Sequence, residues 1–460
     1  MSQNKGSKEE MFQSPKGMRD IIGDDFYSYQ GFFEKAQEIA EYYGFRPIQT
    51  PILEHEEIFT KGVGDGTDIV DKEIYSVRTK GGDKLAMRPE GTAPVMRAYI
   101  EHGMQNKPQP VKFYYYGPTF RHDKPQKGRY REFYQFGIEV LGSPKSIMDA
   151  MVIHMGILML KEAGVENVSL KINSIGDAES RKDYLKELIN YYKKHLSKMS
   201  ATDRQRIKTN PLRILDSKDP KMAEINAEAP QSVSYLNSES KKHFKEVMEH
   251  LNELGVDYEL DHTLVRGLDY YTHTVFEFFT TEKEEDVVEA VKEEVVEGAE
   301  VKEKVAEAPE EVTVTRRLAL GGGGRYDYLS KAMGYKKEIP GVGFGLGVDR
   351  IIEASKKIPN PKIKKKAKVY FIQLGTEAKM KSLNVIEILR ENKIPVRQSL
   401  GKDSLSSQLA VAEKIGVPFS IIFGQKEALE NSVIVRDMAS RSQKTVDIDK
   451  LAKYLKNLKS

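Results

Sequence analysis

The spacing of apolar residues predicts a helix near the start of the chain and an extended segment directly after it. In the segment 26–43, apolar side chains recur at steps of four and three residues, which places them on one helix face: Tyr29, Phe33, Ala36, Ala40 and Tyr43. Gly44 is well placed to end this helix. The extended segment that follows, FRPIQTPILE, contains Pro47 and Pro51. Because each proline removes a backbone donor, we expect this segment at a sheet edge or an interface.

After these segments, a mixture of strand-like and helical runs gives way to a mostly helical stretch, and strand-like runs then return. Strand-like runs alternate with helices before residues 175–255, which are polar and mostly helical. Strand character returns at 256–279 and again at 312–320. We therefore interpret residues 1–357 as one domain that contains a helical insertion subdomain at 175–255.

The last part of the chain has a different period. Residues 358–366, with two prolines and a lysine cluster, have the composition of a linker. After it, strands alternate with helices over residues 367–460. This alternation predicts a separate small α/β domain with a largely parallel sheet.

The composition fits a multidomain globular protein and excludes several chemistries. The chain has 460 residues, which at about 150 residues per domain suggests about three folding units. It has no cysteine, so a disulfide framework, a cysteine-ligated zinc ion and a thiolate nucleophile are excluded. Its longest apolar stretch, 147–160, is shorter than the roughly 20 residues of a bilayer crossing, and its polar N-terminus lacks a signal-peptide core. We expect a soluble, cytoplasmic protein with no membrane partner.

The net charge of +3 hides two segments of opposite sign. Residues 281–311 carry 13 acidic and 4 basic side chains, whereas residues 356–460 carry 22 basic and 10 acidic ones. A C-terminal part this basic attracts polyanions such as nucleic acid, although a lysine-rich soluble surface is the alternative. We interpret the acidic segment as a surface insertion, with a binding role as the alternative.

The first segment with candidate chemistry is a predicted hairpin, VKFYYYGPTFRHDKPQKGRYREFYQFGIEVLG. Its second arm alternates strictly, with a core face and a second face from which Gln135 and Glu139 project on either side of Gly137. We expect a ligand to lie on this second face, because the glycine leaves room. Arg121 in the first arm would lie over the same face, with a plain surface arginine as the alternative. The connecting loop offers cations for phosphate contacts: His122, Lys124, Lys127, Arg129 and Arg131.

The second segment, GVGFGLGVDRII, has a glycine at every second position from Gly341 to Gly347. As a strand, it has one face without side chains, which a flat ring or a phosphate chain can approach closely. Asp349 and Arg350 follow at the entrance to a helix. The alternative is a glycine-rich strand packed tightly against a helix. The preceding run GGGGRYD lacks the Lys-Ser/Thr ending of a Walker loop, which excludes that kind of phosphate site.

Two further segments gather polar and aromatic residues next to glycines. LVRGLDYYTHTVFEF brings Arg266, Tyr270 and Tyr271 together before a strand, where a tyrosine-rich strand entry is the alternative. MRPEGTAPVMRAYIEH places Glu90 and Thr92 just before a helix. For these two residues, helix capping and a favourable contact with the helix dipole are the alternative roles.

Together these segments resemble the histidyl-tRNA synthetases, a family of class II aminoacyl-tRNA synthetases, from about residue 12 onward. FRPIQTPILE resembles motif 1 of the class, FRHDKPQKGRYREFYQFGIEVLG motif 2 and GVGFGLGVDR motif 3, whereas MRPEGT, LVRGLDYYT and GGGGRYD are similar to segments particular to the family. The resemblance implies an α+β fold. An antiparallel-sheet class II synthetase catalytic core with a helical insertion would precede a C-terminal α/β anticodon-binding domain.

The resemblance also implies a reaction and its partners. L-histidine and ATP would form histidyl-adenylate and pyrophosphate, and the histidyl group would then pass to the 3′ end of tRNA(His), with release of AMP. Motif 1 implies a homodimer, and ATP implies Mg²⁺ as the cofactor, with no protein side chain assigned as a metal ligand. The basic residues 367–460 agree with an anticodon-binding role. Residues 281–311 depart from the family, in which this link is generally short.

The family's nucleotide-site residues carry over onto matching positions. Arg121 would bind the α-phosphate of ATP, with Arg266 on its other side, and Arg350 would bind the γ-phosphate. Gly345 and Gly347 would lie beneath the nucleotide. Three loop cations are expected to contact tRNA: Lys124, Lys127 and Arg129.

The histidine-binding residues carry over in the same way. The α-amino group of histidine would be held by Glu90, Thr92 and Gln135, and Gly91 is also expected to bind histidine. Glu139 and Tyr271 would contact the imidazole ring, and Tyr270 and Tyr326 would complete the pocket. A site that accepts an imidazole N–H rejects apolar analogues by about four orders of magnitude, so no editing domain is expected.

Two rival interpretations share part of these features. The synthetase-like regulatory subunit of ATP phosphoribosyltransferase resembles the catalytic core, but it lacks the anticodon domain and usually degrades the Arg-Gly-Leu-Asp-Tyr-Tyr segment, which is intact here. The second rival is a nucleic-acid-binding module with an inactive synthetase core. The presence of Glu90, Arg121, Arg266 and Arg350 argues against it.

Overall fold

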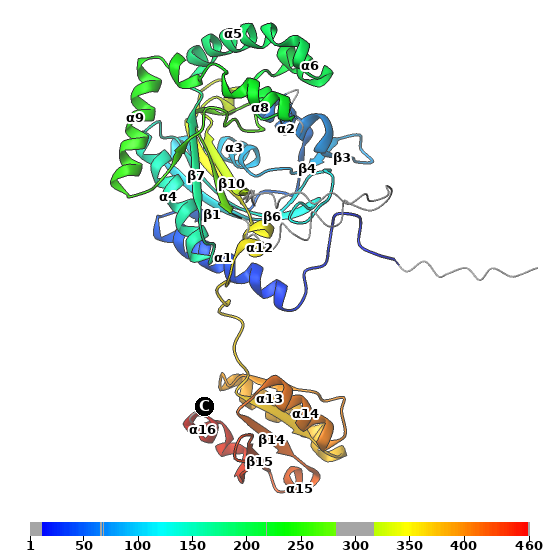
Figure 1. Ribbon diagram of the computed structural model, residues 1–460. Helices are drawn as coiled ribbons and strands as arrows, with labels where there is room; N and C mark the ends of the chain where they lie inside the picture. Colours follow the sequence, from blue (N-terminus) through cyan, green and yellow to red (C-terminus); the bar gives the residue numbers. More distant parts are fainter. Residues whose placement is uncertain (1–11, 65–66, 68, 218, 282–316, 459–460) are drawn as a thin grey trace, which may run out of the picture. The chain divides into compact units, whose positions relative to one another are not determined.

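The computed structural model divides the chain into two compact units, Met1–Pro361 and Lys362–Ser460. Figure 1 shows both units, and each has its own sheet and its own hydrophobic core. The structure describes residues 12–64, 67, 69–217, 219–281 and 317–458. The acidic segment 281–311, apart from its first residue, therefore lies outside the described residues.

An eight-stranded sheet forms the centre of the first unit. Its strands are β1 (Arg46–Pro47), β5 (Val111–Phe120), β6 (Glu132–Leu141), β7 (Ser169–Ser174), β8 (Glu259–Leu260), β9 (Thr272–Thr281), β10 (Arg317–Arg325) and β11 (Gly341–Gly347). Their order is β1-β5-β6-β11-β10-β9-β7-β8, and only the two outermost pairs, β1 with β5 and β8 with β7, are parallel. The mainly antiparallel core expected from the sequence is confirmed. The proline-rich segment supplies the edge strand β1, as its missing donors require.

Helices cover one face of this sheet (Figure 1), and apolar side chains pack between them and the strands. The helices are α1 (Asp24–Tyr42), α4 (Ser146–Glu162), α9 (Ser238–Glu253) and α12 (Val348–Ala354). α1 is the helix that the apolar spacing predicts. On β6 the predicted core face is buried, with Phe136, Ile138 and Val140 fully enclosed.

The opposite face carries smaller elements and a second apolar cluster. These elements are α2 (Glu56–Val63), α3 (Thr92–Glu101), α11 (Leu329–Ala332) and the small sheet β2 (Leu53–His55), β4 (Lys84–Met87) and β3 (Tyr75–Arg78), in that strand order. Short helical turns complete the unit at Ile69–Glu73 (η1), Met104–Asn106 (η2), Leu196–Lys198 (η3) and Ser232–Tyr235 (η4). The candidate site lies on this face of the large sheet.

The helical insertion has a core of its own. Its helices are α5 (Ala178–Lys194), α6 (Ala201–Thr209), α7 (Leu212–Leu215) and α8 (Pro220–Ala227). Side-chain caps begin three of them, because Asp177, Ser200 and Asp219 each accept a bond from a free backbone N–H of the first turn. α9, although it follows in the same helical stretch, buries Phe244 and Val247 in the core beside α4. It therefore packs with the layer on the large sheet.

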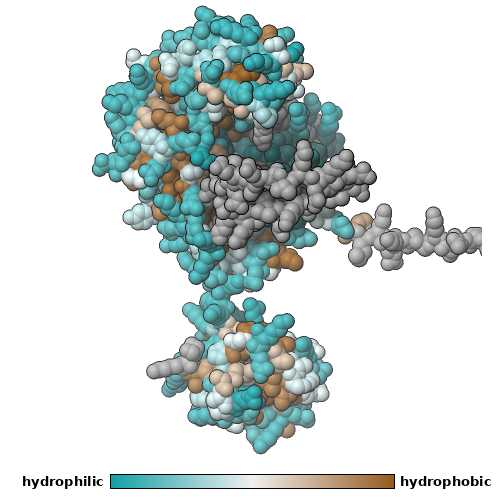
Figure 2. Space-filling view, in the orientation of Figure 1, coloured by the Kyte–Doolittle hydropathy of each residue, from teal (hydrophilic) through white to brown (hydrophobic). Residues whose placement is uncertain are grey.

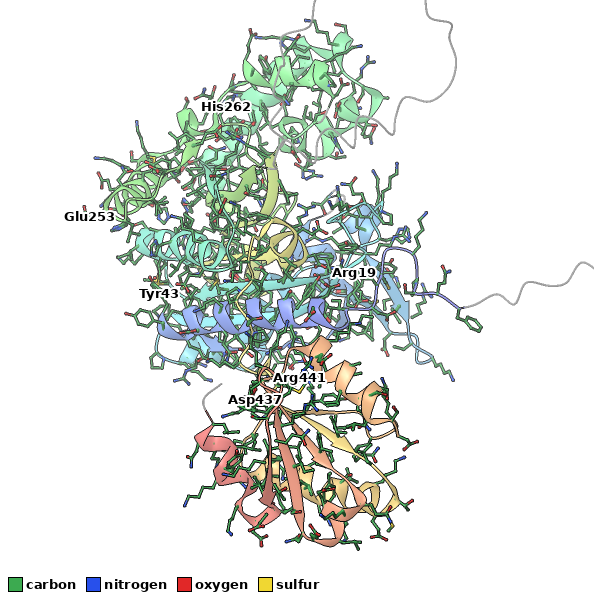
Figure 3. All side chains as sticks on the ribbon, turned by 60° about the horizontal axis from the view of Figure 1, so that its bottom comes forward. Arg19, Tyr43, Glu253, His262, Asp437 and Arg441 are labelled. Carbon is green, nitrogen blue, oxygen red and sulfur yellow. The ribbon has the colours of Figure 1, made fainter. Side chains whose placement is uncertain are left out.

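The second unit is a five-stranded sheet with helices. Its elements are β12 (Val369–Gln373), α13 (Thr376–Glu391), β13 (Val396–Gln398), α14 (Leu405–Ile415), β14 (Phe419–Phe423), α15 (Gln425–Leu429), β15 (Ser432–Asp437), β16 (Gln443–Asp447) and α16 (Ile448–Asn457). In the order β13-β12-β14-β15-β16, the first three strands are parallel, as the alternating pattern predicts, and the last two form an antiparallel hairpin. Asp437 and Arg441 bound its turn (Figure 3), where Asp437 accepts bonds from the backbone N–H groups of Ala439 and Ser440.

The surface of both units is mostly hydrophilic in the view of Figure 2, with scattered hydrophobic side chains. Within the part of the chain that the structure describes, no helix combines the length and the apolar character needed to cross a membrane.

Candidate active site

One cavity of about 620 Å³ on the site face of the large sheet brings the three predicted arginines together. Arg121 follows β5, Arg266 precedes β9 and Arg350 lies in the first turn of α12. The same cavity is lined by the predicted nucleotide-site glycines and by a predicted substrate residue: Gly345, Gly347 and Gln135. Residues more than 200 positions apart in the sequence therefore face a single space.

Arg121 and Arg350 are held through backbone carbonyls. Arg121 Nε donates to the carbonyl of Pro89 at 2.9 Å, and Arg350 donates to the carbonyls of Gly128 and Ala319 at 3.0 and 2.8 Å. Among the described residues, no carboxylate lies within ion-pair distance of either guanidinium. Burial lowers the pKa of both groups, which shows that their charge is poorly compensated within the chain. An anion in the cavity would provide that compensation.

Arg266 differs from the other two because it has a carboxylate partner. Its Nη1 lies 2.7 Å from Glu277 Oε1 on the neighbouring strand β9. Burial opposes the charge of Arg266, but Glu277 together with the nearby Tyr271 and Tyr270 outweighs it and raises the pKa. The Nε atom is buried with no hydrogen-bond partner among the described residues. Arg266 thus stays charged and oriented, with a donor still unused.

A cluster of buried polar and aromatic side chains, which we call the carboxylate pocket, is centred on the fully buried Glu139 of β6. Thr92 Oγ1 and Tyr115 OH donate to its Oε1 at 2.7 and 3.3 Å, and Tyr326 OH donates to Oε2. Burial raises the pKa of Glu139 to about 8, and Glu90 adds to the rise, whereas the hydroxyl donors oppose it. The carboxyl group is therefore a proton acceptor that is poised close to neutral pH.

Glu90 lies just before α3, and its contacts show that Glu90, and not Thr92, caps this helix. The carboxylate of Glu90 accepts bonds from the backbone N–H groups of Thr92 and Ala93 at 2.7 and 2.9 Å, so Glu90 itself caps the helix. The hydroxyl of Thr92 is free to reach Glu139 instead. Burial raises the pKa of Glu90, and Tyr270 OH donates to it at 3.4 Å.

Tyrosine rings form the walls of the pocket. The rings of Tyr270 and Tyr271 lie 4.8 Å apart, and Tyr270 meets Tyr326 edge-on at 5.9 Å. All three rings are buried. The structure therefore brings together predicted histidine-site residues from four separate segments.

Tyr115 is a pocket residue that the sequence analysis missed. Its ring covers Gly91 and Gly137, where a Cβ at either position would collide with it. The expectation that a ligand lies over Gly137 is therefore wrong, because Tyr115 fills that space. A signal was present, since Tyr115 shares its strand face with Gly117, Thr119 and Arg121.

The bare face of β11 is also only half open. A Cβ at Gly343 would collide with the carboxylate of Glu139, and one at Gly341 with the ring of Tyr326. Gly345 and Gly347 line the cavity. The glycines thus serve two purposes: the first two admit side chains of the pocket, and the last two leave room for a ligand.

The motif 2 loop and the N-terminal segment border the cavity. Arg129 pairs with Asp123, and both line the cavity, whereas Lys124 and Lys127 are exposed. Arg19 (Figure 3) donates to Asp349 Oδ1 at 2.8 Å, and Tyr29 of α1 donates to the same oxygen at 2.6 Å. Asp349 therefore anchors the segment before α1 next to Arg350.

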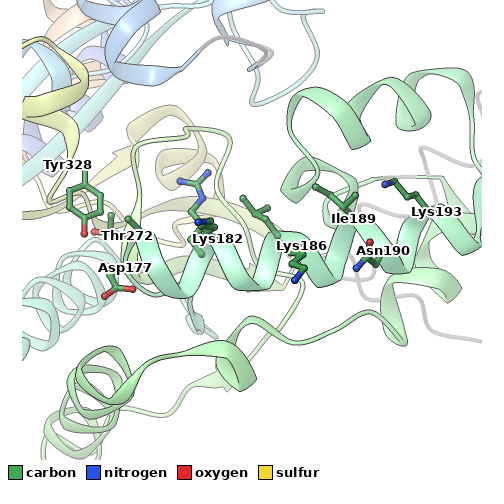
Figure 4. Close-up of a pocket in the computed structure, with 11 residues that line it drawn as sticks. Asp177, Lys182, Lys186, Ile189, Asn190, Lys193, Thr272 and Tyr328 are labelled. Atoms are coloured by element: carbon green, nitrogen blue, oxygen red, sulfur yellow. The ribbon is translucent and has the colours of Figure 1, made fainter.

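A second cavity, of about 600 Å³, runs along α5 (Figure 4). Basic side chains of that helix line it: Arg181, Lys182, Lys186 and Lys193. Leu185 and Ile189 form its apolar part, and Thr272 and Tyr328 close the end nearest to the large sheet. Its charge suits a polyanion.

A mainly antiparallel sheet that presents motif 2 and motif 3 arginines to a common nucleotide cavity defines the catalytic domain of class II aminoacyl-tRNA synthetases. Comparison with known proteins supports this class and also identifies the family. Residues 17–291 match the family described as Histidyl-tRNA synthetase, and residues 368–458 match the Anticodon binding domain.

Full-length relatives carry the same description. The histidine–tRNA ligase of Acetivibrio thermocellus is 37% identical over 448 residues, with 96% of this chain and 99% of the relative covered. That of Bacillus subtilis is 36% identical over 450 residues, with 97% and 98% covered. The apo histidyl-tRNA synthetase of S. aureus superposes with a TM-score of 0.74 at 29% identity over 97% of this chain and 100% of that one.

The chain belongs to the histidyl-tRNA synthetase family, and it has histidine–tRNA ligase activity, the attachment of histidine to tRNA(His). A Bacillus halodurans structure described as an ATP phosphoribosyltransferase regulatory subunit/histidyl-tRNA synthetase has a TM-score of 0.58 at 21% identity, with 91% of this chain and 99% of that one covered. That likeness concerns the fold alone.

Proposed function

We propose that histidyl-adenylate forms in the cavity, with the triphosphate of ATP held by three arginines. Arg121 and Arg266 bind the α-phosphate from two sides, Arg350 binds the γ-phosphate, and the nucleotide lies over Gly345 and Gly347. Attack of a carboxylate on phosphorus needs alignment and compensation of developing negative charge. Guanidinium groups provide both as fixed, permanently charged donors. The observation that carries this proposal is that all three arginines line one cavity.

Histidine binds in the adjoining carboxylate pocket. The imidazole N–H donates to Glu139 and the ring contacts Tyr271, while Tyr270 and Tyr326 close the pocket. Support comes from the three hydroxyl donors that fix the Glu139 carboxylate and from its complete burial. Oε2 accepts only one of these bonds, so a ring without an N–H would leave its second acceptor site buried and unpaired. The α-amino group is bound by residues at the start of α3 and on β6: Glu90, Gly91, Thr92 and Gln135.

Mg²⁺ enters this scheme with ATP. Within the described residues, no three acidic or histidine side chains are grouped as a metal site. The carboxylates of Glu277 and Asp349, which line the cavity, are each paired with an arginine. We therefore assign no protein side chain as a ligand of the ion and no step to it. Phosphate oxygens and water are its expected ligands.

The tRNA is bound by basic surfaces of both parts of the chain. Arg129 lines the cavity, and Lys124 and Lys127 are exposed in the same loop. We assign all three cations to contacts with the 3′ end. The basic groove along α5 offers further phosphate contacts (Figure 4). We assign anticodon binding to residues 367–460, catalysis to residues 1–357 and a linker role to 358–366. The excess of basic residues in the C-terminal part supports this assignment.

We also propose a homodimer that forms through the motif 1 segment, in the cytoplasm, where tRNA and ATP are available. Ile52 and Leu53 are 43% and 42% exposed. Leu53 borders a groove of about 580 Å³ whose apolar lining includes Leu85, Ile100 and Met333. Exposed apolar residues beside an apolar groove are typical of an interface. Sedimentation of the full chain tests this proposal, because an Ile52→Glu, Leu53→Glu variant should sediment as a monomer.

The decisive experiment is the exchange of labelled pyrophosphate into ATP with each of the twenty amino acids in turn. Exchange with histidine alone supports the proposed pocket, and substitution of Glu139 by Gln should abolish that preference. Exchange with several amino acids, or a Glu139→Gln variant that still selects histidine, would show that the pocket is assigned wrongly.

A further inference from the structure

The motif GGGGRYD contains an arginine, Arg325, that none of the proposed roles uses. Its guanidinium is fully buried and pairs with the equally buried carboxylate of Asp149 on α4. Arg325 Nε lies 3.2 and 3.1 Å from the two carboxylate oxygens, and Nη2 donates to one of them. Burial opposes both charges, but each partner stabilises the other, so that the pKa of Asp149 lies below its usual value and that of Arg325 above. Both groups are therefore charged at neutral pH.

The same guanidinium reaches the turn that joins β6 to α4. Nη1 donates to the carbonyl of Ser143 at 3.0 Å and Nη2 to that of Lys145 at 3.3 Å. Asp149 itself lies in the first turn of α4. Arg325, the last residue of β10, is thus bonded to the end of β6 and the start of α4, although β11 lies between β10 and β6 in the sheet.

The side chains of Arg325 and its neighbour Tyr326 make their contacts on opposite faces of the sheet. Arg325 lies on the side that α4 covers, whereas the hydroxyl of Tyr326 donates to Glu139 in the pocket. Glu139 is near the end of β6, and Gly343 of β11 is paired with it. Because Gly343 has no side chain, Tyr326 and Glu139 meet across the intervening strand. Their contact therefore depends on how the ends of β6 and β10 are held relative to one another.

We infer that Arg325 is a positioning residue for the recognition of histidine. It fixes the end of β10 against the β6–α4 turn and so aligns the Tyr326 hydroxyl with the Glu139 carboxylate, without touching the substrate. Asp327 extends this link, because its Oδ1 accepts bonds from Arg325 Nη1 at 3.2 Å and from the backbone N–H of Gly341 at 3.1 Å. The inference rests on the proposed histidine pocket.

Lysine cannot replace this arginine in the proposed role. A lysine at position 325 keeps a positive charge beside Asp149, but its single ammonium group cannot reach the carbonyls of Ser143 and Lys145 as the planar guanidinium does. Arg325→Lys therefore weakens the link between β10 and the β6–α4 turn while it retains the buried ion pair. It is the variant that separates positioning from charge compensation.

The test is histidine-dependent pyrophosphate exchange by Arg325→Lys, Tyr326→Phe and the double variant, with active sites counted from the burst of adenylate. We expect Arg325→Lys to raise KM for histidine about tenfold and to change KM for ATP by less than about twofold, with the same number of active sites. Tyr326→Phe should also raise KM for histidine. The double variant should be no worse than the worse single variant, because both changes affect one contact.

A matched control and a second variant keep the test decisive. His243 of α9 has its Nε2 atom 3.2 Å from the same Asp149 carboxylate, and His243→Gln should leave KM for histidine unchanged. If Arg325→Lys does not fold, Arg325→Met combined with Asp149→Leu removes both buried charges together and should still raise KM for histidine. Additive effects in the double variant, an equal rise of KM for ATP, or a loss of active sites at unchanged KM would overturn the inference. An unchanged KM for histidine in Tyr326→Phe would instead overturn the proposed pocket.

Discussion

In the proposed histidine pocket, the ionisation of Glu139 makes histidine activation depend on pH, and Tyr326 controls this dependence. With a pKa of about 8, only about one tenth of the Glu139 carboxyl groups are ionised at pH 7 in the free enzyme. The imidazole N–H needs the ionised form, so kcat/KM for histidine should rise through pH 8 and level off above about pH 9. The Tyr326 hydroxyl donates to Glu139 and lowers its pKa. Tyr326→Phe must therefore raise the pKa and move this rise to higher pH.

The size of the shift follows from the strength of the lost bond. A hydrogen bond to a charged group contributes about 1.5–3 kcal/mol, and about 1.4 kcal/mol corresponds to one pKa unit. We therefore expect the midpoint to rise by about one to two units, which lowers kcat/KM at pH 7 by about tenfold to a hundredfold. The assay is pyrophosphate exchange at low histidine from pH 6 to pH 10. Titration of the substrate itself affects both enzymes equally and cancels in their ratio. A ratio that stays constant over this range would refute the reasoning.

Three further predictions concern the rest of the site and the second unit. Arg266→Ala should slow pyrophosphate exchange at least about a hundredfold with an unchanged circular dichroism spectrum, and near-normal exchange would exclude the proposed role. Removal of residues 367–460 should abolish tRNA charging but largely spare pyrophosphate exchange, and undiminished charging would contradict an anticodon-binding role. Because the pKa of Glu139 is about 8 in the folded chain and about 4.3 when unfolded, stability falls as pH rises through that window. The urea midpoint of Glu139→Gln minus that of the wild type should therefore increase from pH 5 to pH 8. A constant difference would show that Glu139 does not titrate as described.

Elements with a strong local pattern could be predicted from the sequence. The steps of apolar residues predict α1, and strict alternation predicts the core face of β6 with Phe136 and Ile138. Both patterns arise because a helix or a strand repeats its side-chain direction at a fixed period. The parity of β5 also places Arg121 over the site. The convergence of its three arginines comes from the order of strands in the sheet, which no local pattern contains.

Features that depend on distant partners could not be predicted. Asp149 and Arg325 are 176 positions apart, and neither lies in a pattern that indicates an ion pair. The glycine run before Arg325 also depends on residues that are distant in the sequence. Side chains at Gly322 and Gly323 would collide with the backbone of Phe276 on β9 and of Gly343 on β11, respectively, so close packing between strands demands this run. The sequence pattern does not predict β16, because four of its five residues are exposed at a sheet edge and show no apolar alternation.

The two halves of the site share one electrostatic property. Burial lowers the pKa of Arg121 and of Arg350 and raises that of Glu139, so in each case the charged form is penalised by its surroundings. In the proposed complex, the triphosphate supplies negative charge to the arginines, and the imidazole N–H supplies a donor to the carboxylate. Each substrate would thus offset the cost of burying a charged side chain. Contacts to groups whose charge increases in the transition state would stabilise it most. Because Arg266 already has Glu277 as a partner, its proposed role predicts that it stabilises bound ATP less than it stabilises the charge that develops on the α-phosphate.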